Sequence, residues 1–121
     1  MDELINIIKS ISDKTRLRIL HLLIKSGREL CICEIMDSLQ LPQPNISNHI
    51  RELKMAGLVK EQRNGRFILY SVDKLQDRFM ENIKEAVNSA PEKYFIEDDK
   101  RLRKRLSLRI NGKIVIGVRK G

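Results

Sequence analysis

Two cysteines, Cys31 and Cys33, are separated by one residue and are the side chains of this sequence best suited to chemistry. Thiolate sulfur is a soft ligand that prefers soft or borderline ions, and neighbouring thiols can also be oxidised. The amphipathic start MDELINIIKS does not have the form of a secretory signal, and no stretch is long and apolar enough to span a bilayer. We therefore expect a cytoplasmic protein, in which thiols stay reduced and a metal-binding or redox pair is favoured over a structural disulfide.

The spacing of the cysteines constrains how they can act together. We expect a short helix from Cys31 to Leu39, and residues two apart on a regular helix point about 200° away from one another. Both sulfurs could then hold one ion only if the first helical turn were unwound, so ion binding would distort the start of this helix. The alternative is that the two cysteines are small, partly buried apolar residues.

A second group of polar side chains lies on a helix expected from Pro44 to Met55, with Gln43 just before it. Its apolar seam is narrow and consists of Ile46, Ile50 and Leu53. The remaining face carries hydrogen-bonding groups, which are Asn45, Ser47, Asn48, His49, Arg51 and Lys54. Asn and Gln can pair with adenine and Arg with guanine, whereas Ser and Lys more often hold phosphates. We expect this helix, including Gln43 and Pro44 at its start, to read the major groove of duplex DNA.

A β-hairpin is expected to follow, with strands from Leu58 to Arg63 and from Arg66 to Val72. Asn64 and Gly65 lie between the strands, and Asn-Gly favours the positive φ angles of a type I′ turn. Arg63 and Arg66 flank the turn. The hairpin tip, including Asn64, should therefore reach DNA in an adjacent groove or along the backbone.

Three further helices should position these groups: Asp2–Ile11, Lys14–Lys25 and Asp73–Ser89. Asp13 suits the N-cap of the second helix and Gly27 its end. The last helix carries an apolar stripe, which consists of Leu75, Phe79, Met80, Ile83 and Val87. The order of elements predicts a mainly α fold with small β content, a winged helix-turn-helix of the form α-α-α-α-β-β-α, over residues 1–90.

We expect residues 91–121 to form a basic C-terminal extension. The chain has a net charge of +8, and Lys100–Gly121 holds nine Lys or Arg and no acid. Alternating apolar residues on either side of Asn111-Gly112 suggest a C-terminal β-hairpin or an extended basic tail. The basic patch suggests a polyanionic partner, and Lys100–Arg105 would then contact DNA phosphates. The alternatives are a dimer or partner contact and a solubilising tail.

Several motifs in order resemble the ArsR/SmtB family of metal(loid)-responsive repressors over roughly residues 3–90. Leu30-Cys31-Ile32-Cys33-Glu34-Ile35 resembles the metal-binding box of arsenical-type repressors. The run from Ser12 to Leu17 is similar to their second-helix entry, and the run from Gln43 to Ile50 to their recognition helix. The resemblance implies a homodimer, built on the N-terminal helix and the helix at 73–89, that leaves its operator when a metal(loid) binds Cys31 and Cys33.

The inducer implied by this box is As(III) or Sb(III). Divalent Zn, Cd or Pb is a weaker candidate because these ions usually take four ligands. The places where similar repressors have a third cysteine are occupied by Met36 and Ile114. Two thiolates would then need an outside thiol or hydroxide to complete the coordination of As(III).

Other functions remain as alternatives. A regulator of the same fold could use the thiols as a redox switch, or could have become a protein-interaction module. An enzyme is not expected, because the sequence has no Ser/His/Asp order, phosphate loop or paired carboxylates. His49 is expected to face DNA and His21 to be a core or interface residue.

Overall fold

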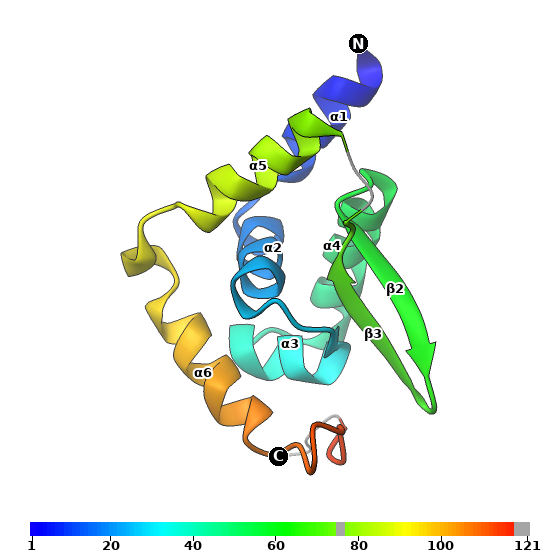
Figure 1. Ribbon diagram of the computed structural model, residues 1–121, viewed down its shortest axis with the longest axis vertical. Coiled ribbons are helices and arrows are strands. Elements are labelled where there is room, and N and C mark those ends of the chain that lie inside the picture. The colour runs from blue at the N-terminus through cyan, green and yellow to red at the C-terminus, as the bar shows by residue number, and fades with distance from the viewer. Residues whose placement is uncertain (75–76, 118–121) are drawn as a thin grey trace.

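The computed structural model describes residues 1–74 and 77–117 and is mainly helical with one small sheet. In chain order the elements are α1 (Asp2–Ser10), α2 (Lys14–Ser26), β1 (Leu30–Cys31), α3 (Ile32–Leu39), α4 (Gln43–Met55), β2 (Val59–Asn64), β3 (Phe67–Val72), α5 (Arg78–Asn88), the 3₁₀ helix η1 (Glu92–Tyr94) and α6 (Ile96–Leu106). Helix α2 lies in the middle of the molecule, with the hairpin on one side and α6 on the other (Figure 1). The predicted winged helix-turn-helix is confirmed.

The hydrophobic core forms around α2, which buries apolar side chains on several of its sides. Helices α3 and α4 contribute the facing residues, so that the fully buried set includes Ile19, Leu20, Leu22, Ile35, Ile46 and Leu53. Asp13 caps α2 by accepting the backbone N–H of Arg16 at 3.0 Å, and Gly27 ends the helix at a φ of 62°. Both helix signals were predicted correctly from the sequence.

A three-stranded antiparallel sheet has the order β1-β3-β2. The strand β1 was not predicted: Leu30 pairs with Tyr70 and Cys31 pairs with Leu69. Helix α3 therefore begins at Ile32, not at Cys31 as predicted, because the backbone of Cys31 is held extended by the edge of β3. The hairpin is present, but Asn64 pairs with Phe67.

The hairpin turn consequently differs from the prediction by one residue. Its two central residues are Gly65 and Arg66, and among these Gly65 has the positive φ of 62°. The turn at Asn64-Gly65 was wrong because the half-buried side chains of β3 fix the strand register, and the turn follows that register. Helix α4 also begins one residue early, so Gln43 lies inside the helix and not before it.

Helix α5 starts later than the predicted Asp73, because Asp77 is its N-cap and accepts the backbone N–H of Met80 at 3.0 Å. Asp73 and Lys74 precede it in a loop. Leu75, predicted as part of the apolar stripe, lies outside the described residues. Within residues 1–74 and 77–117, no helix is long and apolar enough to cross a membrane.

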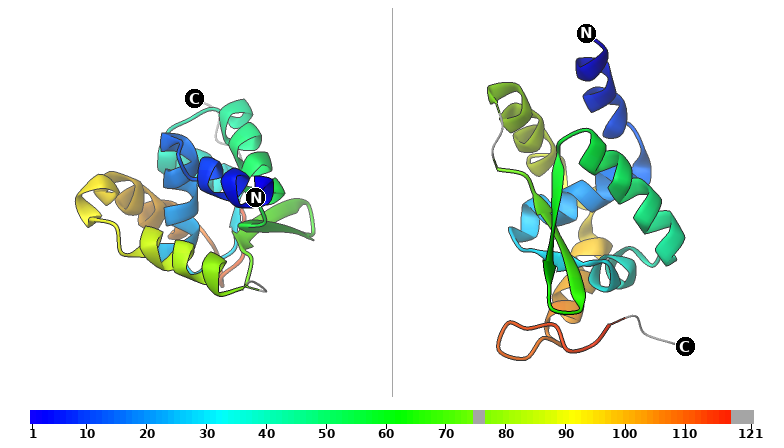
Figure 2. Two further views of the ribbon diagram at one scale, coloured as in Figure 1. Left: turned by 90° about the horizontal axis from the view of Figure 1, so that it is seen from above. Right: turned by 90° about the vertical axis from the view of Figure 1, so that its right-hand side faces the viewer.

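The C-terminal region differs most from the prediction. Lys100–Arg105 belongs to α6, and Leu106 ends this helix instead of starting a strand. The predicted C-terminal hairpin is reduced to a turn with one bridge between Ile110 and Lys113, while Val118 lies outside the described residues. Acidic residues occupy the first turn of α6 and basic residues its last turn, which matches the helix dipole. Two views show α6 running beside α3 (Figures 1 and 2).

Ion pairs hold α6 and the following turn to the rest of the chain, so this segment is not a free basic tail. Arg105, whose side chain is 2% exposed, donates to Asp37 of α3 at 2.7 Å. Arg18 of α2 donates twice to the buried carboxylate of Asp98, at 2.9 and 2.8 Å, and Arg101 donates to it at 3.0 Å. Arg101 and Arg105 thus neutralise carboxylates of the chain itself. They are therefore less available to DNA phosphates than the prediction for the whole of Lys100–Arg105 requires.

Candidate nucleic-acid interface and adjoining thiol pair

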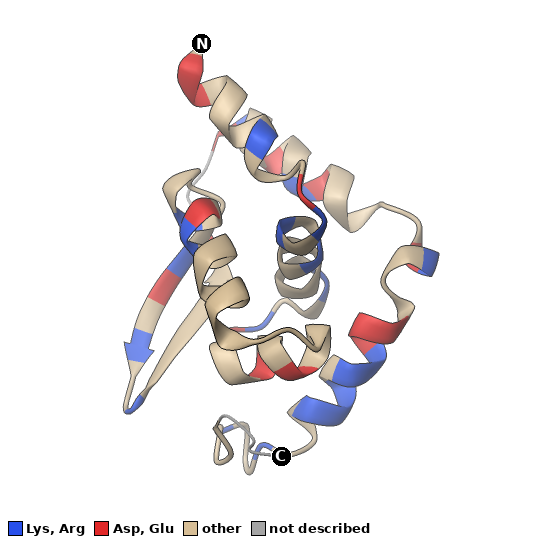
Figure 3. Ribbon diagram, turned by 180° about the vertical axis from the view of Figure 1, so that it is seen from behind, with Lys and Arg blue, Asp and Glu red and all other residues tan. Residues whose placement is uncertain are grey.

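Helix α4 presents a polar face to solvent. Ile46, Ile50 and Leu53 are buried as the narrow seam predicts, and the exposed side chains opposite are Gln43, Pro44, Asn45, Asn48 and Arg51. Seen from behind, most of this helix is uncharged, with charges gathered near its end (Figure 3). Uncharged amides on an exposed helix face suit hydrogen bonding to base edges better than non-specific attraction to phosphate.

Three of the predicted DNA-contacting residues are only half exposed, and two of them have partners within the protein. His49 Nδ1 lies 3.6 Å from Asp13 Oδ2 and 3.3 Å from Arg16 Nη1. Lys54 forms an ion pair with Glu61 of β2. Ser47 is the third residue, and it faces the cavity described below. His49 thus joins α4 to α2, and Lys54 joins α4 to the wing, which is the hairpin of β2 and β3. The sequence did not indicate this role.

Arg16 and Asp13 support the start of the interface. Besides contacting His49, Arg16 donates to the carbonyl of Ser10 at 2.6 Å and to that of Lys9 at 3.3 Å. The pKa of Asp13 is lowered, chiefly because its carboxylate accepts the backbone N–H of Arg16. The end of α1, the start of α2 and the middle of α4 are therefore fixed relative to one another.

The wing tip is basic and exposed. Arg63, Asn64 and Arg66 all lie at the hairpin end, where Figure 3 shows Lys and Arg positions in blue. The guanidinium carbon of Arg66 lies 4.9 Å from the centroid of the Phe67 ring. This cation–π contact orients Arg66.

The two cysteines are buried and their sulfurs meet. Cys31 and Cys33 are 2% and 3% exposed, and their Cα atoms are 5.3 Å apart. The structure joins them by a disulfide. Cys31 is the N-cap of α3 and has an extended backbone, so helical geometry does not fix the direction of its side chain. The prediction that the helix must unwind before both sulfurs can hold one ion is therefore wrong.

A cavity of about 280 Å³ connects the thiol pair with the DNA-contacting face. It is lined by residues of four segments: Cys31, Ile32 and Cys33; Gln43 and Ser47 of α4; Arg66, Phe67, Ile68 and Tyr70 of the wing; and Gly117. Burial raises the pKa of Tyr70. The two sulfurs thus share one cavity with three of the predicted DNA contacts, Gln43, Ser47 and Arg66.

A buried ion pair ties the thiol segment to the end of the chain. Glu34, which is fully buried, accepts the backbone N–H of Cys31 at 3.1 Å. Arg109 donates to both oxygens of the same carboxylate, at 2.7 and 2.6 Å, and to the carbonyl of Glu29. Glu34 follows Cys31 by three residues, the spacing of a capping box, so this half of the arrangement had a sequence signal. Arg109, 75 residues further on, had none.

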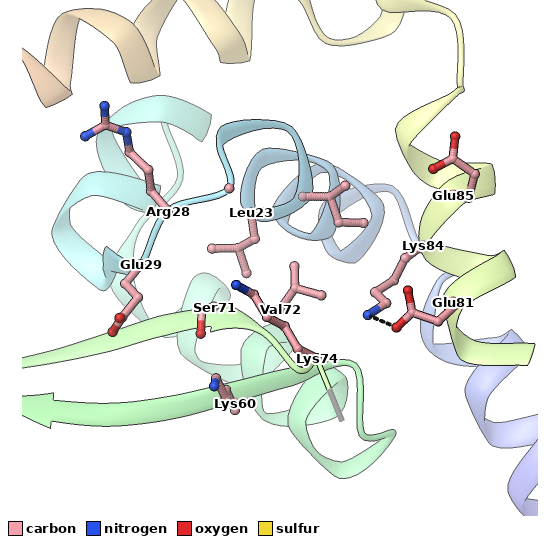
Figure 4. A pocket seen from close by; sticks show the side chains of 12 residues that line it. Leu23, Arg28, Glu29, Lys60, Ser71, Val72, Lys74, Glu81, Lys84 and Glu85 are labelled. Carbon is pink, nitrogen blue, oxygen red and sulfur yellow. Dashed lines mark hydrogen bonds and ion pairs between the residues drawn. The ribbon is translucent and has the colours of Figure 1, made fainter. Parts of the chain in front are cut away.

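A second cavity of about 470 Å³ lies between α2, α5 and the sheet (Figure 4). Its lining carries cations, among them Lys60 and Lys74, and carboxylates, among them Glu81 and Glu85. The buried Lys84 is already bound to Glu81 at 2.8 Å and to the carbonyl of Asp73 at 2.9 Å. Its described lining has four cations and three carboxylates and no thiol or imidazole, so this cavity does not suit a thiophilic ion.

Comparison with known proteins gives a consistent result. Residues 13–61 match the model of the family described as bacterial regulatory protein, arsR family. The chain is 45% identical over 78 residues to an uncharacterised HTH-type transcriptional regulator of Methanocaldococcus jannaschii, which covers 64% of this chain and 84% of the relative. It is 31% identical over 96 residues to the arsenic resistance transcriptional regulator ArsR1 of Pseudomonas putida, which covers 79% of this chain and 74% of that protein.

Among solved structures, reduced HlyU from Vibrio cholerae superposes with a TM-score of 0.61 at 23% identity, covering 71% of this chain and 85% of that chain. At this identity the likeness concerns the fold alone.

Proposed function

Since the chain belongs to the ArsR/SmtB family of helix-turn-helix transcriptional repressors, we propose that it leaves its operator when Cys31 and Cys33 bind a thiophilic metalloid, As(III) or Sb(III). In this proposal α4 enters the major groove and the wing tip contacts the flanking DNA. Asn45, Asn48, Arg51 and Gln43 supply base contacts, and Arg63 with Asn64 supplies backbone contacts. As the relatives are transcriptional regulators, the expectation of a protein without enzymatic activity agrees with the family.

We further propose that the working unit is a homodimer formed through α1 and α5. Both helices lie toward the end of the molecule that carries the N-terminus (Figure 2). They expose large apolar side chains, namely Leu4, Ile5 and Ile8 on α1 and Phe79 on α5. Burying such a face against a second copy would bring two α4 helices onto one duplex.

The thiol chemistry is a ligand exchange without change of oxidation state. Two Cys–SH groups replace two hydroxides of As(OH)₃, giving a Cys₂As–OH centre and two waters. The disulfide must first be opened, which two molecules of a low-molecular-weight thiol accomplish while becoming one disulfide themselves. Within residues 1–74 and 77–117 there is no cluster of three or more His, Cys, Asp or Glu that could hold a metal ion, so zinc, cadmium and lead are expected to bind more weakly.

The observation that carries the proposal is the shared cavity. The thiol pair and the side chains of Gln43, Ser47 and Arg66 line the same space of about 280 Å³. An ion bound to the sulfurs therefore stands beside groups that face DNA, and the coupling needs no long pathway. Such a ligand shifts the equilibrium between the DNA-bound and the DNA-free protein, because it binds the DNA-free form more tightly.

The proposal is tested by fluorescence anisotropy on a duplex selected by this protein from random sequences. We expect arsenite, added to the reduced protein, to release the selected duplex, and Cys31→Ser with Cys33→Ser to abolish release without loss of DNA affinity. Ile32→Val is the matched control, because it lies between the cysteines and leaves both thiols. If arsenite does not change the affinity of the wild type, the metalloid proposal is wrong; if no duplex is preferred over random DNA, a protein-interaction module is favoured.

A redox switch is the second candidate, and the disulfide between Cys31 and Cys33 favours it. Here two-electron oxidation of the dithiol by a peroxide, which is reduced to water or an alcohol, would change DNA affinity. Anisotropy with oxidised and reduced protein, in the absence of arsenite, distinguishes the candidates. Equal affinity of the two forms would eliminate the redox switch.

A further inference from the structure

The two cysteines leave the coordination of As(III) at this site incomplete. As(III) in its thiolate complexes forms three bonds in a pyramidal arrangement, and the chain contains two cysteines. The third position therefore belongs to a group from solution. A hydroxide or a thiol can fill it, and a soft ion prefers sulfur.

The cavity beside the sulfurs is much larger than a hydroxide requires. Its volume is about 280 Å³, whereas one water occupies about 30 Å³ in the liquid. The wall next to the cysteines is apolar, with Ile32, Phe67 and Ile68. This space fits the carbon chain of a small organic ligand bonded to the arsenic.

The polar residues that line the cavity indicate which functional group that ligand carries. Among the described residues that line this cavity, Arg66 carries a positive charge and none is Asp or Glu. Within the part of the chain that the structure describes, Arg66 contacts the Phe67 ring and pairs with no carboxylate. Gln43 and Ser47 add hydrogen-bond donors. A guanidinium next to an amide and a hydroxyl recognises a carboxylate.

We propose that the inducer site takes a low-molecular-weight thiol bearing a carboxylate as the third ligand of As(III), with Arg66 binding the carboxylate. The overall step joins two Cys–SH and one R–SH to As(OH)₃, giving Cys₂As–SR and three waters, with no electron transfer. This inference rests on the proposed function and names the complete ligand. It also supplies a release mechanism, because the carboxylate occupies Arg66, Gln43 and Ser47 in place of DNA.

The test compares mercaptoacetate with 2-mercaptoethanol, which have similar size but differ in charge. Reduced protein without DNA is titrated with arsenite in each thiol, and binding is followed by calorimetry. We expect arsenite to bind about five- to tenfold more tightly in mercaptoacetate, as for one charge-assisted contact at a partly exposed site. Arg66→Gln should bring the ratio of the two affinities close to one, and Arg66→Lys should restore part of it.

Arg63→Gln is the matched control, because Arg63 is also a wing-tip arginine but does not line the cavity. It should keep the wild-type ratio, and native mass spectrometry should detect one arsenic and one mercaptoacetate per chain. A hydroxide in place of the thiol, or an unchanged ratio in Arg66→Gln, would overturn the inference and leave arsenite sensing intact. No arsenite binding in either thiol would refute the proposed function itself, and this inference with it.

Discussion

The ion pair between Glu34 and Arg109 gives a quantitative prediction for Arg109→Ala. Glu34 is fully buried, and Arg109 is 12% exposed, so the pair is shielded from solvent. The guanidinium makes two hydrogen bonds to the carboxylate, and this contact raises the pKa of Arg109. In the variant, Glu34 keeps the backbone N–H of Cys31 as its donor and loses its counter-ion.

Removing one partner of a buried pair costs about 3–5 kcal/mol, because the remaining charge is left without compensation. Arg109 lies near the surface, so water can reach the vacated space, and we expect the lower value of about 3 kcal/mol. For a chain of 121 residues, the entropy of unfolding corresponds to about 0.25 kcal/mol per kelvin. The melting temperature should therefore fall by about 12 °C.

The assay is urea unfolding of the reduced protein, followed by far-ultraviolet circular dichroism at one fixed protein concentration, because association would change the apparent stability. Arg103→Ala is the matched control, since Arg103 belongs to the same region but is exposed. Its free energy of unfolding should change by less than about 0.5 kcal/mol. Adding Glu34→Gln to Arg109→Ala should recover most of the loss, because the amide still accepts from Cys31 and carries no charge.

Two results would refute this reasoning. Equal stability of Arg109→Ala and Arg103→Ala would mean that the C-terminal turn does not neutralise Glu34 in solution. A further loss on adding Glu34→Gln would mean that the carboxylate is not the uncompensated group.

Three further outcomes are expected. Asn45→Ala should weaken binding to the selected duplex by about 1–3 kcal/mol and leave random duplex unaffected, whereas Arg63→Ala should weaken both alike and lower the salt slope by about one, as read by anisotropy. Ile8→Asp should give monomers in sedimentation experiments, while Glu3→Lys, on the same helix, should not; a dimeric Ile8→Asp would exclude α1 from the interface. Burial lowers the pKa of His21, which stacks on Phe95 at 3.6 Å. In this pH range His21 binds a proton in the unfolded chain more readily than in the folded protein. The free energy of unfolding is therefore highest above a pH of about 6.5 and decreases as the pH falls toward the folded-state pKa of His21. His21→Phe should flatten the pH dependence of urea unfolding in that window, and a curve identical to the wild type would contradict this.

Burial also confirms the expectation that His21 is a core residue, since its side chain is 2% exposed. Its Nδ1 has no hydrogen-bond partner within the described residues and lies 3.9 Å from Asp99. Burial raises the pKa of Asp99 in turn. The sequence indicated the location of His21 because apolar residues surround it on α2, but it did not identify Phe95 as the stacking partner.

The sequence by itself determined the elements that depend on local periodicity and local capping. The apolar seam of α4, the cap at Asp13 and the stop at Gly27 involve residues within a few positions of each other, and all were predictable. The exposed amides of α4 follow from the same periodicity. The family resemblance in the cysteine box likewise depends on residues adjacent in the chain.

Only the tertiary structure decided how the distant segments meet. Cys31 leaves helical geometry because β3 pairs with it, and that pairing joins residues 38 positions apart. Helix α6 lacks a wide apolar stripe and is held by Arg105–Asp37 and Arg18–Asp98, pairs separated by 68 and 80 residues. Ion pairs between segments this far apart follow no period along the chain, so the sequence gives no pattern from which to predict them. The cavity that places the thiols beside Gln43 and Arg66 arises in the same way, from four segments that only folding brings together.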